Sequence, residues 1–392
     1  MSDPAPHRRF RDLDIGERRA HIAETCNLDL AELQHALDTG GIDPETADRM
    51  VENALGLLGL PFGVALNFRI NGRDHLVPMA IEEPSVIAAA SHAAKRIREG
   101  GGFIATSTDP IMIAQIEVHD VPDEPAAVER ILAEAEALKA AADRAVPTLV
   151  ERGGGARGLR VRALGEGFVV VHLEIDCREA MGANIVNTVA ESLGPRVAEL
   201  CNGTLGLRIL SNFCDLRTTR VTARIPISAM ASKEVDGLEA ARGVASASRF
   251  AELDPYRAVT HNKGAANGMD AVIVATGNDW RATAAAAHAY AARTGQYRPL
   301  ATWRLNQDET ALEGMMEVAI AVGAIGGALR AHRGARLALS ILRVESSTEA
   351  SFGPGHRPPP ASLSNLAALR ALTEGIQRGH MRLHHRATTE GK

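Results

Sequence analysis

The sequence is poor in aromatic residues, which make up only 3% of its 392 residues. Its core must therefore rest on Ala, Leu, Val and Ile, although the chain is long enough for two or three domains. An excess of one charge is also missing, because 43 Lys and Arg stand against 48 Asp and Glu, a net charge of −5. This balance gives no reason to expect nucleic acid as a partner, while local basic groups can still bind anionic ligands.

Cysteines and long apolar runs are scarce as well. The four cysteines, at positions 26, 177, 201 and 214, form no C-x-x-C pair, so we expect neither a zinc site nor a disulfide framework, but free thiols in a reducing cytoplasm. The longest apolar run, residues 315–329, contains Glu317 and several glycines. A bilayer span needs about 20 apolar residues, and the N-terminus lacks an apolar signal core. We therefore expect a soluble cytoplasmic protein without a bound metal.

The N-terminal part predicts helices followed by a hairpin. Three helical patterns open the chain, at residues 14–25, 29–38 and 44–58. Asp43-Pro44 resembles a capping Asp followed by Pro in the first turn. Two β-type runs then flank the tight-turn signal Asn71-Gly72, at residues 64–70 and 76–81. A helix of small residues follows to about residue 98 and ends at three glycines.

The middle of the chain has its own order of elements. The expected elements are a strand at 111–119, a helix at 124–150, strands at 159–164 and 168–176, a helix at 184–201 and a strand at 205–211. This is the β-α-β-β-α-β order of a ferredoxin-like unit. We therefore predict an α+β protein, in which a small ferredoxin-like domain, residues 109–215, is inserted into a large mixed α/β domain formed by residues 1–108 and 216–378.

Beyond residue 216 the pattern alternates again. We expect a helix at 233–250, an apolar strand at 271–276 and an alanine-rich helix at 281–293. Residues 351–360 read SFGPGHRPPP, a composition that cannot form a helix.

Two glycine motifs stand at the borders of elements in the small domain. Residues 153–158 match G-x-G-x-x-G, but they follow a helix and lead into a strand, whereas a dinucleotide-binding fingerprint follows a strand and opens a helix. A simple glycine turn fits better. Residues 176–184, DCREAMGAN, do leave a strand and enter a helix, whose free amides can bind a pyrophosphate. An ordinary helix cap is the alternative.

Three further polar positions have both a functional and an ordinary interpretation. Glu83 precedes Pro84 and a helix, where the helix dipole favours a carboxylate, so simple capping is the alternative to catalysis. The polar residues 254–264 and 277–281 flank the expected apolar strand. They form either a functional cluster at the ends of the strand or a solvated loop. A lone histidine such as His380 is usually structural.

Taken together, these segments resemble one family from about residue 10 to residue 380: the class II, bacterial-type 3-hydroxy-3-methylglutaryl-CoA reductases. The matching segments are long and specific, and they are ENALGLLGLP (52–61), VPMAIEEPSVIAAAS (77–91), MGANIVNT (181–188), DPYRAVTHNKG (254–264), ATGNDWRA (275–282) and EGIQRGHM (374–381). The resemblance implies an oxidoreductase of the mevalonate pathway. It would interconvert hydroxymethylglutaryl-CoA and mevalonate plus coenzyme A, using two hydrides from NADH or NADPH.

The resemblance also implies roles for four residues in the chemistry. Lys263 matches the cation that stabilises the thiohemiacetal oxyanion and supplies a proton, the kind of aid that is largest in a dry site. Glu83 matches the acid that protonates the aldehyde oxygen in the second reduction. Asp279 matches the carboxylate that couples these two groups, and His380 matches the histidine that protonates the departing thiolate of coenzyme A.

Further matches concern ligands and assembly. The hydroxymethylglutaryl group is held at the positions of Ser85, Arg257 and Asn267, and Arg11 falls where a basic residue contacts coenzyme A. Positions matched to the cofactor, which the family binds on its ferredoxin-like domain, are Val146, Glu179, Met181, Gly182, Asn184 and Asn212. Family members are homodimers or assemblies of dimers with shared active sites, and residues 52–61 belong to that interface.

The sequence departs from the family in three places. NADH-using members carry an acid at the position of Val146, so we expect NADPH to be preferred over NADH, although Asp143 lies one turn earlier and either cofactor stays open. A continuous amphipathic helix is replaced by the segment around 351–364, with Ser364 at the position of a glutamine. Only twelve residues follow His380, so we expect the mobile C-terminal flap to be largely absent, with residues 379–392 as its remnant.

These departures leave two functions open. The intact Glu83, Lys263, Asp279 and His380 favour a working reductase. The altered segment and the short C-terminal end favour a catalytically impaired paralogue that binds coenzyme A ligands without turnover.

Overall fold

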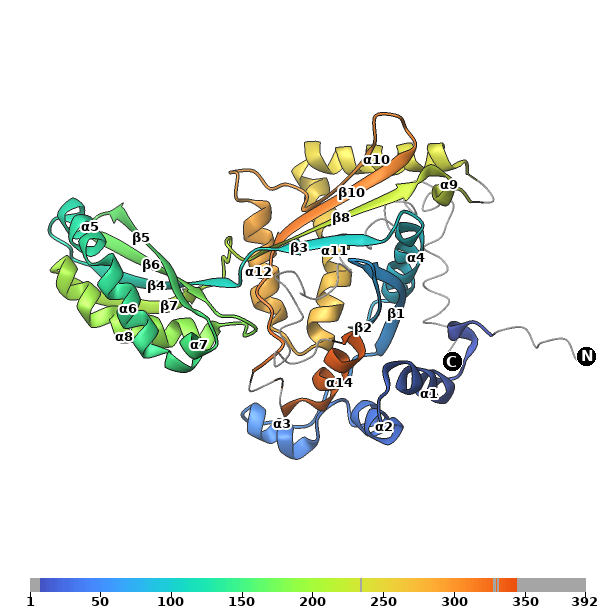
Figure 1. Cartoon of the computed structure of the whole chain (residues 1–392), viewed down its shortest axis with the longest axis horizontal. Coiled ribbons are helices and arrows are strands. Elements are labelled where there is room, and N and C mark those ends of the chain that lie inside the picture. Colours follow the sequence, from blue (N-terminus) through green and yellow to red (C-terminus); the bar gives the residue numbers. More distant parts are fainter. Residues whose placement is uncertain (1–7, 233–234, 327–328, 330, 344–392) are drawn as a thin grey trace, which may run out of the picture.

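The structure, a computed structural model, describes residues 8–232, 235–326, 329 and 331–343. Two β-sheets lie in two parts of the molecule that are joined by a pair of extended segments (Figure 1). The first part of the large domain contains η1 (Phe10–Asp12), α1 (Ile15–Cys26), α2 (Leu30–Asp38), α3 (Pro44–Met50), β1 (Phe62–Ile70), β2 (Arg73–Ala80), α4 (Val86–Arg98) and β3 (Phe103–Ser107).

The small domain and the rest of the large domain follow in turn. The small domain contains β4 (Ile111–His119), α5 (Glu124–Ala133), α6 (Ala135–Ala145), α7 (Pro147–Glu151), β5 (Gly155–Gly165), β6 (Phe168–Asp176), α8 (Ala183–Cys201) and β7 (Thr204–Ser211). The chain then returns to the large domain with β8 (Thr218–Pro226), α9 (Ile227–Met230), α10 (Gly237–Leu253), α11 (Pro255–Ala275), α12 (Trp280–Ala291), β9 (Ala301–Leu305), β10 (Ala311–Ala319) and α14 (Arg333–Leu342).

The small domain has the order of a ferredoxin-like unit. Its sheet runs β5-β6-β4-β7, and each neighbouring pair of strands is antiparallel. The helices α5, α6, α7 and α8 cover one face of this sheet (Figure 1). The predicted α+β class and the ferredoxin-like insertion are therefore confirmed. The single helix expected at 124–150 is wrong, because Glu134 has non-helical angles and Pro147 begins a separate helix.

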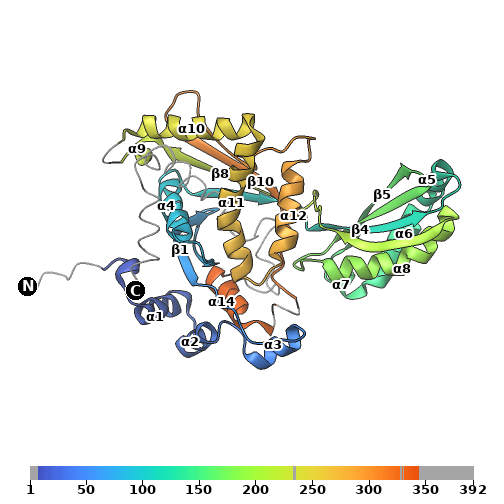
Figure 2. The ribbon, with the colours of Figure 1, turned by 180° about the vertical axis from the view of Figure 1, so that it is seen from behind.

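The large domain is built on a mixed sheet of six strands in the order β2-β1-β3-β8-β10-β9. The neighbours β1 and β3 are parallel, while the other neighbouring pairs are antiparallel. Helices α11 and α12 pass through the middle of this domain, as the view from behind shows (Figure 2). Trp303 and Phe103 are among its fully buried side chains.

The hairpin predicted at Asn71-Gly72 is present between β1 and β2. Both residues have positive φ angles, 49° for Asn71 and 79° for Gly72, as a two-residue hairpin turn of the primed type requires. The hairpin leads directly through residues 81–85 into α4, so it determines where Glu83 lies.

Residues 51–61 are not helical, which corrects the helix expected at 44–58. Helix α3 ends at Met50 because Val51 is extended, and the positive φ angles of Asn53 and Gly56, 58° and 151°, exclude a right-handed helix beyond it. The segment beyond it instead leaves several leucines on the surface, among them Leu55 and Leu58, which are almost completely exposed.

The apolar strand expected at 271–276 is also wrong. Residues 255–275 form one continuous helix, α11, and the run lies in its last turns. Val272 and Ile273 are each only 1% exposed, since α11 packs against β2, α10 and α12. A short apolar run does not distinguish a buried helix from a buried strand.

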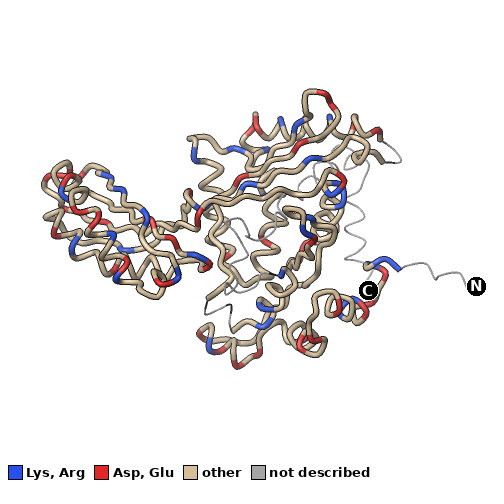
Figure 3. The backbone as a smooth tube through the Cα atoms, in the orientation of Figure 1, with Lys and Arg blue, Asp and Glu red and all other residues tan. Residues whose placement is uncertain are grey.

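Acidic and basic residues are interspersed along the backbone of both domains (Figure 3), in keeping with the near balance of charge in the sequence. Several expectations concern residues 344–392, which lie outside the described residues: the segment around 351–364 with Ser364, the position of His380 and the remnant of a flap.

Candidate active site

Lys263 and Glu83 meet in the structure although 180 residues separate them. The Lys263 ammonium donates to Glu83 Oε2 at 2.8 Å, and the side chains are 61% and 44% exposed. Lys263 lies on helix α11, and Glu83 lies between β2 and α4. The two groups thus form an ion pair that is open to a ligand. Residues 254–264 do not form the solvated loop that was the alternative interpretation, since Lys263 lies within helix α11.

The turn of α11 that carries Lys263 is anchored by the two residues before it, each 2% exposed. His261 Nε2 bonds the carbonyl of Ala301 at 2.8 Å. The amide of Asn262 donates to the carbonyl of Arg298 at 2.9 Å and accepts from the backbone of Leu300 at 2.8 Å. Burial lowers the pKa of His261, which keeps the imidazole neutral. These bonds fix the direction in which Lys263 leaves the helix.

The residues matched to the hydroxymethylglutaryl group lie on the same two elements. Asn267, one turn beyond Lys263, donates to Glu83 Oε2 at 3.3 Å. Arg257 is six residues before Lys263, about 9 Å along the helix axis, and its backbone amide is capped by Asp254. Ser85 follows Glu83 and has a φ of 71°. A non-glycine residue in this conformation is strained, and such residues often occur at ligand sites.

Asp279 caps the N-terminus of α12. Its carboxylate accepts from the amides of Arg281 and Ala282, both at 3.0 Å, and lies 3.5 Å from the Arg281 guanidinium. These hydrogen bonds keep the carboxylate at the end of its own helix. Coupling of Asp279 to Glu83 and Lys263 therefore stays a prediction.

The glycine turn of DCREAMGAN opens helix α8 as expected. Gly182 is the N-cap, with a φ of 107° and no side chain to cap the first amides of the helix. A Cβ atom on Gly182 would lie 2.6 Å from the sulfur of Cys177, so only glycine fits. Met181 is half-buried before it and Asn184 is exposed just after it. This uncapped helix end suits a phosphate group.

Two other candidate cofactor residues border this turn or the end of β7. Glu179 is exposed, and its carbonyl accepts from the amide of Ala324 at 3.0 Å. Asn212 is exposed directly after β7, and its carbonyl accepts from the amide of Cys214 at 2.9 Å. Both stand where the small domain meets the large one.

Val146 lies between α6 and α7 and packs against the core of the small domain. Asp143, one turn earlier, uses its carboxylate to accept from the amide of Ala156 at 2.7 Å. Two guanidinium groups, those of Arg157 and Arg178, reach the carbonyl of Gly153 in the neighbouring glycine turn. They also lie 3.3 Å and 3.7 Å from a buried carboxylate, Asp176. Residues 153 and 154 thus form a structural turn bordered by positive charge, and residues 155–158 begin strand β5.

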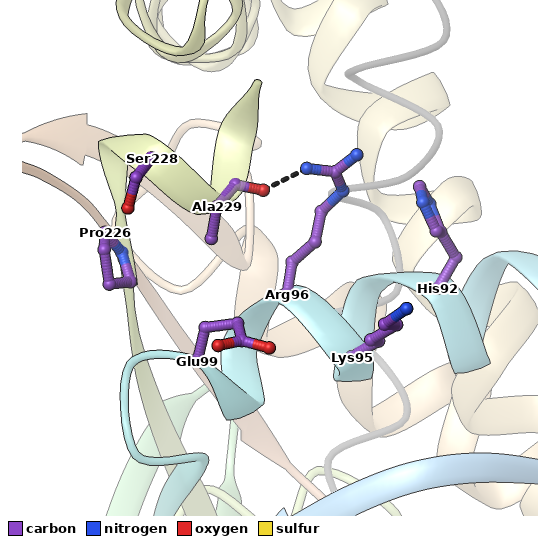
Figure 4. A pocket seen from close by; sticks show the side chains of 7 residues that line it. All are labelled: His92, Lys95, Arg96, Glu99, Pro226, Ser228 and Ala229. Carbon is purple, nitrogen blue, oxygen red and sulfur yellow. Dashed lines mark hydrogen bonds between the residues drawn. The ribbon is translucent and has the colours of Figure 1, made fainter. Parts of the chain in front are cut away.

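A basic pocket that the sequence interpretation missed lies between α4 and α9 (Figure 4). Its volume is about 490 Å³, and its lining residues are His92, Lys95, Arg96, Glu99, Pro226, Ser228 and Ala229. Arg96 donates to the carbonyl of Ala229. The spacing of His92, Lys95 and Arg96, three and four residues apart on a helix, places them on one face and was visible in the sequence.

Arg11 lies in η1 and is not among the residues that line this pocket. Its side chain is 74% exposed and lies 3.5 Å from Asp12, and its carbonyl accepts from Arg18. The fourth matched residue of the chemistry, His380, lies outside the described residues.

Within the described part of the chain, no group of three or more His, Cys, Asp or Glu side chains could hold a metal ion. No helix among the described residues is long and apolar enough to cross a membrane.

Comparisons with known proteins show which proteins the whole chain resembles. The family model for hydroxymethylglutaryl-coenzyme A reductase matches residues 14–385. A 3-hydroxy-3-methylglutaryl-coenzyme A reductase of Archaeoglobus fulgidus is 42% identical over 386 residues, which cover 96% of this chain and 85% of that protein.

Solved structures agree with the sequence comparisons. The class II 3-hydroxy-3-methylglutaryl-CoA reductase from Streptococcus pneumoniae, bound to NADPH in open conformations, has a TM-score of 0.86 and 37% sequence identity, and the match covers 95% of this chain and 90% of that one. A second structure of the reductase from this organism has a TM-score of 0.85 and 36% identity, over 93% of this chain and 98% of that one.

Proposed function

Because the chain belongs to the hydroxymethylglutaryl-coenzyme A reductase family, we propose that the exposed Glu83–Lys263 pair is the centre at which the thioester is reduced. The protein is an oxidoreductase of the class II type, which interconverts hydroxymethylglutaryl-CoA and mevalonate plus coenzyme A. The catalytic interpretation is favoured over a binder without turnover, because the family match extends over nearly the whole chain and both partners of the pair are in place at 2.8 Å.

The first reduction turns the planar thioester carbonyl into a tetrahedral thiohemiacetal, and negative charge develops on its oxygen. Lys263 is the cation that stabilises this oxygen and later donates a proton to it. A preorganised group aimed at developing charge needs no reorganisation when the reaction occurs. Because Lys263 is paired with an exposed carboxylate, that of Glu83, the arriving carbonyl oxygen can take the place of that partner.

The second half of the reaction needs two more protons at different atoms. The thiohemiacetal returns its hydroxyl proton to Lys263 as it collapses to an aldehyde and the thiolate of coenzyme A, and His380 protonates the thiolate. Glu83 then protonates the aldehyde oxygen as the second hydride arrives at the carbon. Two hydrides and two protons thus convert one thioester into one alcohol and one thiol. Asp279, at the N-terminus of α12, completes the set by coupling Glu83 and Lys263.

The substrate is held at both ends of helix α4. Ser85, Arg257 and Asn267 bind the hydroxymethylglutaryl group, for which Arg257 supplies a planar donor pair for the free carboxylate. The basic pocket of His92, Lys95 and Arg96 binds the phosphates of coenzyme A (Figure 4). From Val86 to Lys95 the helix rises by about 14 Å, a distance that the flexible arm of coenzyme A can bridge. Arg11 adds a further positive charge.

The nicotinamide cofactor binds on the small domain at the uncapped start of α8. The residues present fit such a group, since Gly182 leaves the first amides of the helix without a side-chain cap. The pyrophosphate of the cofactor is bound by Met181, Gly182 and Asn184. The edges of the cofactor site are formed by Glu179, Asn212 and Val146. When bound, this cofactor supplies the two hydrides. NADPH is preferred, because Val146 offers no carboxylate to ribose hydroxyls and Arg157 and Arg178 favour a phosphate.

The protein forms a homodimer through the segment after α3. Met50, Val51, Leu55, Leu57, Leu58 and Leu60 are all exposed hydrophobic residues, and large exposed apolar surfaces mark interaction sites. Replacing Leu58 with Asp should produce a monomer in analytical ultracentrifugation, while a dimer of unchanged affinity would exclude this interface. The four cysteines are free thiols, which supports a cytoplasmic location.

A steady-state assay in both directions tests the proposed function. Purified protein is given hydroxymethylglutaryl-CoA with NADH or NADPH, and mevalonate plus coenzyme A with the oxidised cofactors. We expect turnover in both directions, with NADPH and its oxidised form preferred. Turnover no higher than that of a Lys263→Ala variant would contradict the assignment of the centre.

A further inference from the structure

The two domains are joined at a junction where the chain crosses twice. Thr108, before the small domain, accepts from the amide of Thr218 at 2.8 Å and donates to the carbonyl of Leu216 at 2.7 Å, after the domain. Between these two contacts lies Arg217, which is 1% exposed. A charged side chain at such depth needs partners that replace water.

Backbone carbonyls from both domains are the partners of Arg217. Its guanidinium donates to the carbonyl of Ala180 at 3.2 Å and to that of Met181 at 2.9 Å. The other terminal nitrogen donates to the carbonyl of Val322 at 2.6 Å. Ala180 and Met181 belong to the turn that opens α8, whereas Val322 follows β10 of the large domain. One side chain therefore holds the candidate cofactor turn against the large domain.

The segment 320–325 also connects the turn that opens α8 to the large domain. Its Gly323 amide donates to the side chain of Asn278, directly before Asp279, at 2.8 Å. On its other side the Ala324 amide donates to the carbonyl of Glu179 at 3.0 Å. A Cβ atom on Gly323 would lie 2.5 Å from the backbone nitrogen of Met181. The approach is so close that a larger residue would displace the turn.

We propose that Arg217 is a positioning residue, which fixes the Met181–Gly182 turn relative to Lys263 and Asp279 so that the hydride donor stands at reacting distance from the thioester carbon. The inference rests on the proposed function, because it requires the cofactor at this turn and the thioester at Lys263. Hydride transfer needs reacting atoms about 3–3.5 Å apart, and a misplacement of about 1 Å can cost about 10²-fold in rate.

Arginine is the residue that suits this position. Its planar group carries five donors in a fixed arrangement, and here three carbonyls on two domains accept from its two terminal nitrogens. Lysine has a single nitrogen on a flexible chain, so it keeps the charge but cannot hold all three carbonyls in the same geometry. A purely structural arginine would affect stability and leave the reaction of the folded enzyme unchanged, and this difference makes the inference testable.

The test compares Arg217→Lys with Arg130→Lys in the full-length enzyme. Arg130 is a matched control, since it also donates to a carbonyl, that of Leu200 at 2.6 Å, but joins two helices within the small domain. For Arg217→Lys we expect kcat to fall by on the order of 10²-fold, while KM for hydroxymethylglutaryl-CoA changes by less than about twofold. With NADPH deuterated at the transferred position, the isotope effect on kcat should rise, because hydride transfer becomes rate-limiting.

Gly323→Ala is the second variant, and it disturbs the same turn without touching Arg217. As for Arg217→Lys, kcat should fall and the isotope effect on kcat should rise. If Arg217→Lys fails to fold, this variant decides the question. Wild-type kcat and isotope effect in a folded variant, even with a lowered Tm, would overturn the inference. Absence of reduction by the wild-type enzyme would instead overturn the proposed function, so the two failures are distinguishable.

Discussion

The two central cations of this protein, Lys263 and Arg217, are placed in opposite ways. The Lys263 side chain is 61% exposed and has an exposed carboxylate as its partner. Arg217 is 1% exposed and is surrounded by carbonyl groups of both domains. The first cation can exchange its partner for a ligand, and the second cannot do so without leaving buried carbonyls unsatisfied.

This contrast distinguishes a residue that takes part in the reaction, Lys263, from one that positions the backbone, Arg217. An exposed ion pair contributes little to stability, about 0–1 kcal/mol, so the cost of breaking it when substrate binds is small. A buried cation bonded to carbonyls contributes to the geometry of the backbone and takes no part in bond making. The reaction centre and the element that positions the cofactor should therefore respond differently to substitution.

The largest effect is expected at Lys263. Replacing it with Met removes the charge aimed at the oxyanion, so kcat should fall by on the order of 10³-fold. The free energy of unfolding should change by less than about 1 kcal/mol, because the pair is exposed. Steady-state kinetics and urea denaturation of the same preparation measure both quantities.

Lys139→Met is the matched control for this prediction. Lys139 also forms an ion pair at 2.8 Å, with Glu136 on helix α6 of the small domain, and its removal should leave kcat unchanged. If Lys263→Met retained more than about a tenth of the wild-type kcat, the oxyanion role of Lys263 would be wrong.

The second effect concerns stability and should appear at Arg217. Arg217→Met removes the donor of three carbonyls, of which that of Val322 is buried and those of Ala180 and Met181 are part-buried, each costing about 1 kcal/mol. We expect the free energy of unfolding to fall by about 3 kcal/mol, several times the change at Lys263. Urea denaturation measures this value, and similar losses in the two variants would remove the contrast between the two cations.

His172 extends the comparison to a buried group that stays neutral. It is 9% exposed in the sheet of the small domain, and its Nε2 lies within hydrogen-bonding distance of two donors, Gln115 at 2.8 Å and Arg162 at 3.1 Å. Burial, followed by the nearby charges of Arg162 and Arg160, lowers its pKa to about 4, and Asp215 opposes this shift. Unlike Arg217, this side chain has donors rather than acceptors around it.

The sign of the resulting pH dependence follows from that lowered pKa. Below pH 6.5 the unfolded chain binds a proton at His172 that the folded chain does not bind, so stability falls as the pH decreases towards 4. We expect a loss of about 2 kcal/mol at pH 5 relative to pH 8. Urea denaturation against pH should show this slope flattened in His172→Gln and unchanged in His35→Gln, a surface control. An equal slope in all three proteins would exclude His172 as its source.

The small domain could be predicted well from the sequence, because its elements carry local signals. The strand β6 was expected at 168–176 and has those limits, since the turn Gly165-Glu166-Gly167 stands directly before it and Asp176 begins the segment DCREAMGAN. Helix α8 differs by one residue from the expected start. The break of 124–150 into three helices was missed at Glu134, where no Gly or Pro marks the end of the first helix.

The large domain was harder to predict, because a helix that is buried on several faces lacks the regular spacing of apolar residues that identifies an amphipathic helix. Helix α11 has buried residues on several faces in its second half, so the run of Val and Ile gave the pattern of a strand. The meeting of Glu83 and Lys263 depends on the packing of α4, β2 and α11, which no local pattern encodes. Family resemblance brought these two residues together, whereas Arg217 had no signal beyond its charge.

The smallest effect is expected at the cofactor. Arg157 and Arg178 are 44% and 45% exposed, so they resemble Lys263 in being open to a ligand, and both donate to the carbonyl of Gly153 in the glycine turn. A guanidinium at this place favours the extra phosphate of NADPH over the free ribose of NADH. The proposed preference for NADPH then depends on charge at the protein surface.

Arg178→Gln should raise KM for NADPH by about tenfold, which corresponds to about 1.4 kcal/mol, while KM for NADH stays unchanged. Arg160→Gln is the control, because Arg160 lies on the neighbouring strand β5 and pairs with Glu174 at 2.6 Å, away from the turn. The effect on NADPH should decrease with added salt, since exposed charges are screened. Equal changes for both cofactors would mean that Arg178 supports the turn, as Arg217 does, and the group that selects NADPH would have to lie elsewhere.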